Sequence, residues 1–289
     1  MKAVRIHAWN EAPRLEDLPE PQPAPGRTLV RMQAATVGHI DRTVWSGQFL
    51  QAPALPYVPG VEAAGVVLHS EVFTPGERVW LRGAGLGTRG DGTWREVIDA
   101  PDAAIGRLPD GVAMPLGSAF FSPCTSAWVA LHEVAKVRAG ERVLVSGASG
   151  AVGSLAMQLA REAGAEVTAY SAQDDVTQAD VLVDTVGGPV LAAAIERIVP
   201  GGRVVLVGYT AGNELSIDIA RFLQRDVSLL PLNMFRREAA GRAAAPELLA
   251  RLADGRLQLP VQAFKLADAA KALAWITQRG HRGRAVLVP

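Results

Sequence analysis

The 289-residue sequence contains only one cysteine, Cys124. A single cysteine excludes an internal disulfide and a four-cysteine zinc site, and it indicates a reducing compartment such as the cytoplasm. Excess charge of either sign is also missing, because 29 Lys and Arg balance 29 Asp and Glu. This balance gives no general attraction to nucleic acid or to an acidic membrane surface. Nor does any apolar run reach the roughly 18–20 residues that a transmembrane helix needs, and no apolar segment typical of a signal peptide follows the first residues.

The first third of the chain alternates short apolar runs with glycine- and proline-rich turns such as APG, TPGE and LPDG. Short β-type runs between such turns predict a compact, irregular β domain over residues 1–115. The tail, from about 258 to 289, is expected to return to this domain and to contain a helix from about Asp268 to Arg279. The predicted strands are MKAVRI, TLVRMQAATV, AAGVVLH, ERVWL and WREVIDA, with VQAFKL and RAVLVP in the tail.

The middle of the chain, about 116–257, changes to strands that alternate with helices, which predicts an α/β domain with a doubly wound parallel sheet. VLVSGA (143–148) is a short buried-type strand, and EVTAY, DVLVDTVG, RVVLVGY and VSLLPL follow it. Pro231 cannot donate a ladder hydrogen bond, so its strand is expected at the sheet edge, where it would suit a two-fold dimer. Residues 151–164 have helical spacing, with one apolar face formed by Val152, Leu155, Ala156, Leu159 and Ala163.

A glycine turn lies between the strand at 143–148 and this helix. Its pattern, Ala148-x-Gly150-x-x-Gly153, matches G-x-G-x-x-G with alanine first. Gly150 lets the backbone approach a pyrophosphate, Gly153 lets the helix pack closely on the sheet, and the free N–H groups of the helix start hold negative charge. The alternative is a tight turn without a ligand. The expected cofactor contacts are Ser149, Gly150, Ala151, Val152 and Gly153.

The end of the next strand should select the cofactor. An Asp or Glu about 20 residues after the glycine motif binds the ribose of NAD, but Tyr170 and Ser171 stand here. This favours NADP(H), with Ser171 donating to the 2′-phosphate. No Arg or Lys lies between Arg161 and Arg197, and Asp174 or Asp175 could serve NAD instead.

The connection SAQDDVTQA (171–179) is unusually short. About nine residues reach at most ~30 Å, too little for a helix and another strand. The sequence therefore predicts a shortened half of the dinucleotide-binding fold after its second strand, with an open adenosine side.

Nearly the whole chain resembles the zinc-independent quinone oxidoreductase branch of the medium-chain dehydrogenase/reductase superfamily. The segments that carry the resemblance stand in the family's order: VGHIDRTVWSG, PYVPGVEAAGVV, GTWREVIDAPDAAIGRLPDGV, SPCTSAWVALHEVAKVRAGERVLVSGASGAVG, VDTVGG, PGGRVVLVG and RGRAVLVP. The resemblance implies a GroES-like catalytic domain, a Rossmann domain inserted within it, and an active site in the cleft between them.

The resemblance also bears on metal. In the zinc alcohol dehydrogenases the three ligands are a Cys, a His and a Cys, at positions where this chain has Gly38, Val61 and Ser122. Catalytic zinc needs three protein ligands of Cys, His or carboxylate type, so no metal is expected. Glu62, which follows the second of these positions, is retained from the zinc enzymes, and we interpret it as a structural carboxylate.

The same resemblance implies site residues. His39 is a phosphate contact or a surface histidine without a role, and Asp41 is either catalytic or a turn cap. Tyr57, Arg42 and Arg236 are candidate oxyanion donors. The candidate catalytic residues are Asp41, Tyr57 and Asn233, and the remaining cofactor contacts are His39, Ser126, Val186, Gly187, Gly208, Tyr209 and Arg284.

Without a metal to polarise a simple carbonyl, a quinone or a double bond conjugated to a carbonyl is the easier hydride acceptor. The predicted function is a cytoplasmic, homodimeric, NADPH-dependent reductase of quinones or enones. The alternatives are a zinc-type alcohol dehydrogenase and an NADPH-binding regulator that does not catalyse.

Overall fold

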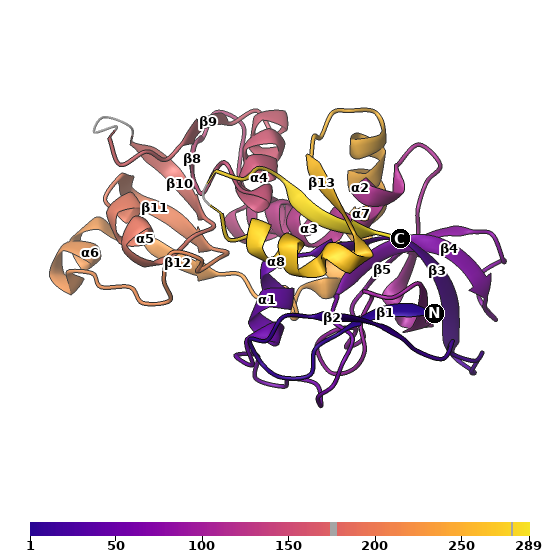
Figure 1. The fold of residues 1–289 in the computed structure, drawn as a ribbon. Helices are drawn as coiled ribbons and strands as arrows, with labels where there is room; N and C mark the ends of the chain where they lie inside the picture. The colour runs from indigo at the N-terminus through magenta and orange to yellow at the C-terminus, as the bar shows by residue number, and fades with distance from the viewer. Residues whose placement is uncertain (174–177, 279) are drawn as a thin grey trace. The chain divides into compact units, whose positions relative to one another are not determined.

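A computed structural model describes residues 1–173, 178–278 and 280–289 (Figure 1). The chain divides into two compact units. Unit 1 comprises residues 1–121, 252–254 and 259–289, and unit 2 comprises residues 122–251 and 255–258. Within the described part of the chain, no helix has the length and apolarity needed to span a membrane.

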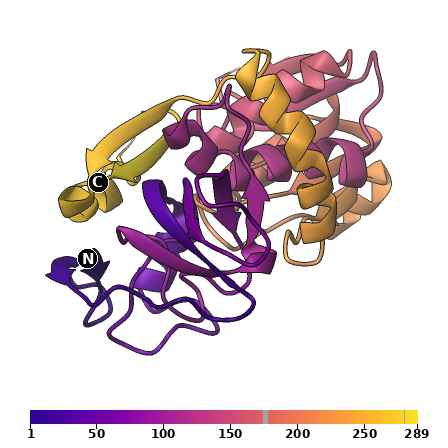
Figure 2. The same cartoon turned by 90° about the vertical axis from the view of Figure 1, so that its right-hand side faces the viewer.

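Unit 1 is built on a seven-stranded sheet with strand order β13-β14-β3-β4-β5-β7 and with β6 paired to β3. The last strand of the chain therefore completes the sheet that the first third begins, as the sequence predicted. Its Ala285–Leu287 segment pairs antiparallel with Ala35–Val37 of β3, and the yellow C-terminal segment is seen from two sides in Figures 1 and 2. The strands are β3 (Arg27–Val37), β4 (Glu62–His69), β5 (Arg78–Arg82), β6 (Val97–Pro101), β7 (Ile105–Arg107), β13 (Val261–Lys265) and β14 (Arg284–Val288).

The remaining elements of unit 1 are short. A separate hairpin-like pair, β1 (Lys2–Arg5) and β2 (Arg14–Asp17), is antiparallel. The core of the unit is apolar and contains the fully buried Trp94, whose indole N–H donates to the carbonyl of Thr36 at 2.9 Å. The helices are α1 (His39–Trp45), α2 (Met114–Ala119) and α8 (Ala269–Trp275). The last helix ends at Trp275, before the predicted end at Arg279, and Arg279 itself lies outside the described residues.

The described residues of unit 2 form five strands, all parallel, in the order β12-β11-β10-β8-β9. This is the predicted doubly wound Rossmann sheet. As expected from Pro231, β12 lies at one edge, and β9 lies at the other. The strands are β8 (Arg142–Ser146), β9 (Glu166–Ala169), β10 (Ala179–Asp184), β11 (Ile198–Leu206) and β12 (Ser228–Pro231).

The helices of unit 2 include the one that the glycine turn opens. α4 (Ala151–Glu162) buries Gly153 and Ala160 together with Leu155, Ala156 and Leu159, so its core face is rotated from the predicted one. Val152 and Ala163 are only half-buried, because the side-chain-free Gly153 brings that side of the helix closest to the sheet. The other helices are α3 (Phe121–Trp128), a π-helical segment (Val129–Ala135), α5 (Gly188–Ile195), α6 (Ile219–Arg225) and α7 (Glu238–Ala253).

Candidate functional site

The glycine turn lies at the carboxyl end of β8. Gly150 is the residue that precedes α4, with extended backbone (φ −75°, ψ 166°), and it has no side chain with which to cap the helix. A Cβ on Gly150 would meet only the carbonyl oxygen of Gly147, at 3.3 Å, so the turn is open beside it. A Cβ on Gly153 would lie 2.3 Å from the same oxygen, which shows how closely α4 approaches the strand. The first backbone N–H groups of α4 have no partner inside the helix and can hold an anionic phosphate.

The sheet order makes this turn a binding position. β8 is followed in sequence by β9 on one side, whereas β10 lies against its other side. The strand order thus reverses between β8 and β10, and open α/β sheets bind ligands at the carboxyl ends of strands at such a switch point.

A buried polar pair joins the ends of these two strands. The Ser146 hydroxyl donates to the Asp184 carboxylate, whose other oxygen accepts from the Gly187 N–H at 2.8 Å. Thr185 N–H donates to the Ser146 hydroxyl at 3.1 Å. Burial raises the pKa of Asp184, while these hydrogen bonds oppose the rise. The pair fixes the turn that follows β10 relative to the turn that follows β8.

The turn after β10 is tightly built around glycine. Gly187 has φ +71°, and a Cβ there would lie 2.5 Å from the carbonyl oxygen of Gly212. The Ala211 N–H donates to the Val186 carbonyl at 2.7 Å. A Cβ on Gly208 would lie 2.2 Å from the Thr185 carbonyl, so the end of β11 also packs directly on this turn. The predicted contacts Val186, Gly187 and Gly208 are therefore brought together in unit 2, and Tyr209, which follows them, is exposed.

The other predicted residues of unit 2 are more dispersed. Ser171 is exposed just beyond β9, and its hydroxyl accepts from the Gln173 N–H at 3.3 Å. Ser126 is half-buried in α3. The Asn233 side-chain oxygen accepts from the N–H groups of Phe235 and Arg236, which commits it to the turn after β12. Asp174 and Asp175, the alternative ribose ligands, lie outside the described residues.

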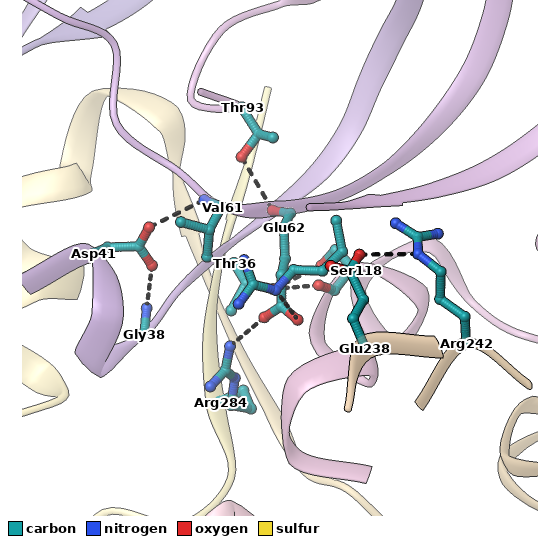
Figure 3. A network of polar contacts seen from close by, with 11 residues as sticks. Thr36, Gly38, Asp41, Val61, Glu62, Thr93, Ser118, Glu238, Arg242 and Arg284 are labelled. Atoms are coloured by element: carbon teal, nitrogen blue, oxygen red, sulfur yellow. Dashed lines mark hydrogen bonds and ion pairs between the residues drawn. The ribbon is translucent and has the colours of Figure 1, made fainter. Parts of the chain in front are cut away.

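In unit 1, Asp41 ties the start of α1 to the start of β4 (Figure 3). One carboxylate oxygen accepts from the Gly38 N–H at 2.7 Å and the other from the Val61 N–H at 3.1 Å. The side chain is buried, and burial raises its pKa to about 7, against the lowering effect of the Gly38 hydrogen bond. The turn-capping role that the sequence left open for Asp41 is thus present in the structure, and its catalytic role stays a prediction.

Arg284 and the buried Glu62 form a second, partly buried contact in unit 1. The Arg284 Nη2 donates to the Glu62 carboxylate at 2.7 Å, and the Arg82 Nε lies 3.8 Å from the other oxygen of Glu62. A Cβ on Gly38 would lie 3.1 Å from the Arg284 guanidinium, so Arg284 fills the space beside the first ligand position of zinc relatives. Val61, at the second position, is fully buried. In the described part of the chain, no group of three or more His, Cys, Asp or Glu side chains is arranged to hold a metal.

His39 and Tyr57 differ in accessibility. His39 begins α1 and is exposed, while local desolvation and then the Arg284 charge lower the pKa of its imidazole. Tyr57 is buried and packs with Ile6, Val44 and the Trp9 ring. Burial raises the pKa of Tyr57, so its phenol stays protonated, and the hydroxyl has no hydrogen-bond partner among the described residues.

The buried carboxyl of Asp41 should make stability depend on pH. The folded pKa of about 7 exceeds the ordinary value of 3.8, so the folded protein binds more protons than the unfolded chain between these values. The unfolding free energy attributable to Asp41 therefore falls as pH rises through this window, by up to about 1.4 kcal/mol per pH unit. Asp41→Asn should remove this dependence, as measured by urea unfolding at pH 5 and pH 8.

Asp110→Asn is the matched control, because the Asp110 side chain is fully exposed. It should leave the difference between pH 5 and pH 8 as in the parent protein. An Asp41→Asn protein with the parent's pH dependence would show that Asp41 is ionised in the folded state throughout.

Sequence reasoning missed three residues of this region: Gly147, Ser146 and Asp184. Gly147, not Ala148, takes the left-handed conformation in the turn (φ +62°), and a Cβ there would lie 2.3 Å from the Thr185 hydroxyl oxygen. The available signal was a polar residue directly after each apolar run, in VLVS and VLVD.

Two family descriptions match this chain. Residues 24–110 match "Alcohol dehydrogenase GroES-like domain", and residues 163–287 match "Zinc-binding dehydrogenase". The chain belongs to the medium-chain dehydrogenase/reductase superfamily. Both halves of its fold, the GroES-like sheet and the Rossmann sheet, are those of this superfamily.

Proteins named quinone oxidoreductase are among its relatives. One from Homo sapiens is 25% identical over 272 residues, covering 81% of this chain and 80% of the relative. One from Pongo abelii is 34% identical over 174 residues, and the match spans 58% of this chain and 51% of that relative. A structure of the quinone oxidoreductase from Thermus thermophilus, described with its NADPH complex, has a TM-score of 0.82 and 26% identity, with both chains fully covered. This chain is an oxidoreductase of the superfamily.

Proposed function

We propose that the protein is a zinc-independent reductase that transfers hydride from NADPH to a quinone or to the β-carbon of an enone. The observation that carries the proposal is the glycine turn, which opens α4 at the point where the strand order reverses. Relatives named quinone oxidoreductase, and a similar structure described with NADPH, support the same class of acceptor and the same donor.

The residues fit such a dinucleotide. Gly150 leaves the turn open for a pyrophosphate, and the N–H groups of Ala151, Val152 and Gly153 belong to the first turn of the helix. We expect Val186, Gly187, Gly208 and Tyr209 to contact the nicotinamide end, with Ser126 and Asn233. We propose His39 and Arg284 as further phosphate contacts, His39 through a neutral imidazole N–H, because its pKa is lowered, and Arg284 through its guanidinium charge.

The bound dinucleotide supplies the hydride, and the overall reaction is quinone plus NADPH plus a proton to hydroquinone plus NADP⁺. What the chain must supply is alignment, exclusion of water and a hydrogen-bond donor for the developing oxyanion. The protonated, unpartnered phenol of Tyr57 supports its assignment as that donor. Asp41 would act on the backbone: by holding the N–H groups of Gly38 and Val61 it keeps α1 and β4 in place.

The test is oxidation of NADPH in the presence of a small quinone or an enone, before and after treatment with a strong chelator. Turnover is expected with NADPH and should be unchanged by the chelator, because Gly38 and Val61 cannot ligate zinc. Loss of activity on chelation, restored by zinc, would instead indicate a zinc-type dehydrogenase. NADPH binding without turnover on any acceptor would indicate a regulator.

We further propose a cytoplasmic homodimer. The support for the compartment is the single cysteine. The support for the dimer is the edge strand β12, together with the exposed Ile219 and Leu223 of α6, the helix that precedes it in sequence. Light scattering should give twice the mass of one chain.

A further inference from the structure

In unit 2 the nicotinamide end of the proposed cofactor site is more completely formed than the adenosine end. The turns that follow β8 and β10 are fixed by glycine contacts and by the buried Ser146–Asp184 pair. The adenosine side lacks such support. In a complete dinucleotide-binding sheet it is formed by the second strand and that strand's outer neighbour. Here β9 is the outermost strand, and no described residue pairs with its free edge.

Chain length explains why β9 ends the sheet. Nine residues, 170–178, separate the end of β9 at Ala169 from the start of β10 at Ala179. A further parallel strand outside β9 would need two crossover connections of about a dozen residues each, in addition to the strand itself. The short connection therefore excludes the strand that would form the outer wall for an adenosine group.

The side chains at the end of β9 offer little in place of that wall. Three of its four residues, Glu166, Thr168 and Ala169, are exposed. The Tyr170 ring is half-buried against the apolar core of unit 2, which limits its use as a stacking surface for adenine. The Ser171 hydroxyl accepts from the Gln173 N–H and keeps a single O–H donor, while no Arg or Lys occurs in sequence between Arg161 and Arg197 to pair with a 2′-phosphate.

We infer that this protein binds its cofactor almost entirely through the nicotinamide ribose phosphate, so that reduced nicotinamide mononucleotide serves as a second hydride donor. The mononucleotide has the same reduced ring and one phosphate, which the N–H groups at the start of α4 can hold. The balanced reaction is mononucleotide plus quinone plus a proton to oxidised mononucleotide plus hydroquinone. This inference rests on the proposed function for its acceptor, and on unit 2 alone for its binding.

Calorimetric titration of the intact protein tests the binding directly, without turnover. We expect the Kd of reduced nicotinamide mononucleotide to lie within about tenfold of the Kd of NADPH, a difference of no more than about 1.4 kcal/mol. We expect adenosine 2′,5′-bisphosphate, a probe for the other end, to bind at least about a hundredfold more weakly than NADPH. A mononucleotide Kd more than tenfold above that of NADPH, or a bisphosphate that binds as tightly as NADPH, would overturn the inference.

A variant pair locates the site. Gly150→Asp places a carboxylate at the helix start, where its backbone conformation is allowed and Asp is a good cap, but where it repels a phosphate. Gly150→Asp should raise the Kd of NADPH and the Kd of the mononucleotide by the same factor. Gly90→Asp is the matched control, because a Cβ at Gly90 meets no atom within 4 Å. If Gly150→Asp weakened the binding of NADPH but not that of the mononucleotide, the mononucleotide would bind elsewhere and the inference would fail.

Quinone reduction with each donor separates this inference from the proposed function. Equal binding of both donors, with no reduction of any quinone or enone, would support the inferred binding mode but refute the proposed function and, with it, the donor role of the mononucleotide. Rapid turnover with NADPH and weak binding of the mononucleotide would support the proposed function and refute the inference. Similar kcat values for the two donors would support both.

Discussion

Gly153→Ala is expected to lower kcat/KM for NADPH about 100-fold, because moving the helix start by about 1 Å misplaces every group that it aligns. The added Cβ would lie 2.3 Å from the Gly147 carbonyl oxygen and 3.0 Å from the Ala148 Cα, and both contacts are with backbone. No side-chain rotation can relieve them, so the start of α4 and the turn at 147–148 must move apart. The overpacking should also cost about 1–3 kcal/mol of unfolding free energy.

The measurements are steady-state kinetics with varied NADPH and urea unfolding. Gly90→Ala is the control, since its Cβ would project into open space at an ordinary φ, and its unfolding free energy should change by less than about 0.5 kcal/mol. A Gly153→Ala enzyme with the parent's kcat/KM would show that the close approach of α4 to the turn does not matter for cofactor use.

Arg284→Met is expected to lower the unfolding free energy by about 1.5–3 kcal/mol, because it removes a charge-assisted hydrogen bond from the buried Glu62 carboxylate. Glu62 is 1% exposed and Arg284 14% exposed at the side chain, and Arg82, whose Nε lies 3.8 Å from Glu62, stays beside the carboxylate in the variant. Unit 1 contains Trp9, Trp45, Trp80, Trp94 and Trp275, so tryptophan fluorescence during urea unfolding mainly reports this unit.

A double-mutant cycle with Glu62→Gln isolates the pairwise contribution. If the cost of Arg284→Met is that of leaving a charge buried, Glu62→Gln should restore much of the stability of the Arg284→Met protein. Lys271→Met is the matched control: its pair with Asp268 has the same 2.7 Å separation, but Lys271 is 75% exposed, and the loss should stay below about 1 kcal/mol. Equal losses in the two variants would show that burial does not strengthen the Arg284–Glu62 contact.

The elements that sequence predicted well are those whose cause is local. Gly150 and Gly153 lie at fixed offsets between an apolar strand and an apolar-faced helix, so their turn could be recognised from 11 consecutive residues, 143–153. Pro231 placed its strand at the sheet edge because it lacks an N–H, and the edge position of β12 confirms this. The 171–179 connection is a similar case, because its length alone leaves no room for a further strand beyond β9.

The features that sequence could not predict depend on distant partners. Glu62 and Arg284 are separated by 222 positions, and nothing near either one signals the other. The burial of Tyr57 depends on Ile6 and Trp9, which reach it from the start of the chain. Gly147 stands next to the motif, but the side chain that leaves no room for a Cβ there is that of Thr185, which follows another strand.

The order in which the two units can be completed follows from the pairing of β14 with β3. Synthesis starts with unit 1, yet the strand that pairs with Ala35–Val37 is the last strand of the chain. Unit 2 has all its residues once position 258 has been made, and can fold as a unit while the growing chain is still attached to the ribosome. Unit 1 must wait for Ala285–Leu287, and until then that edge of β3 is open to pairing with other chains. The unit that begins first is therefore finished last, and its exposed strand edge is the point at which a nascent chain most needs protection.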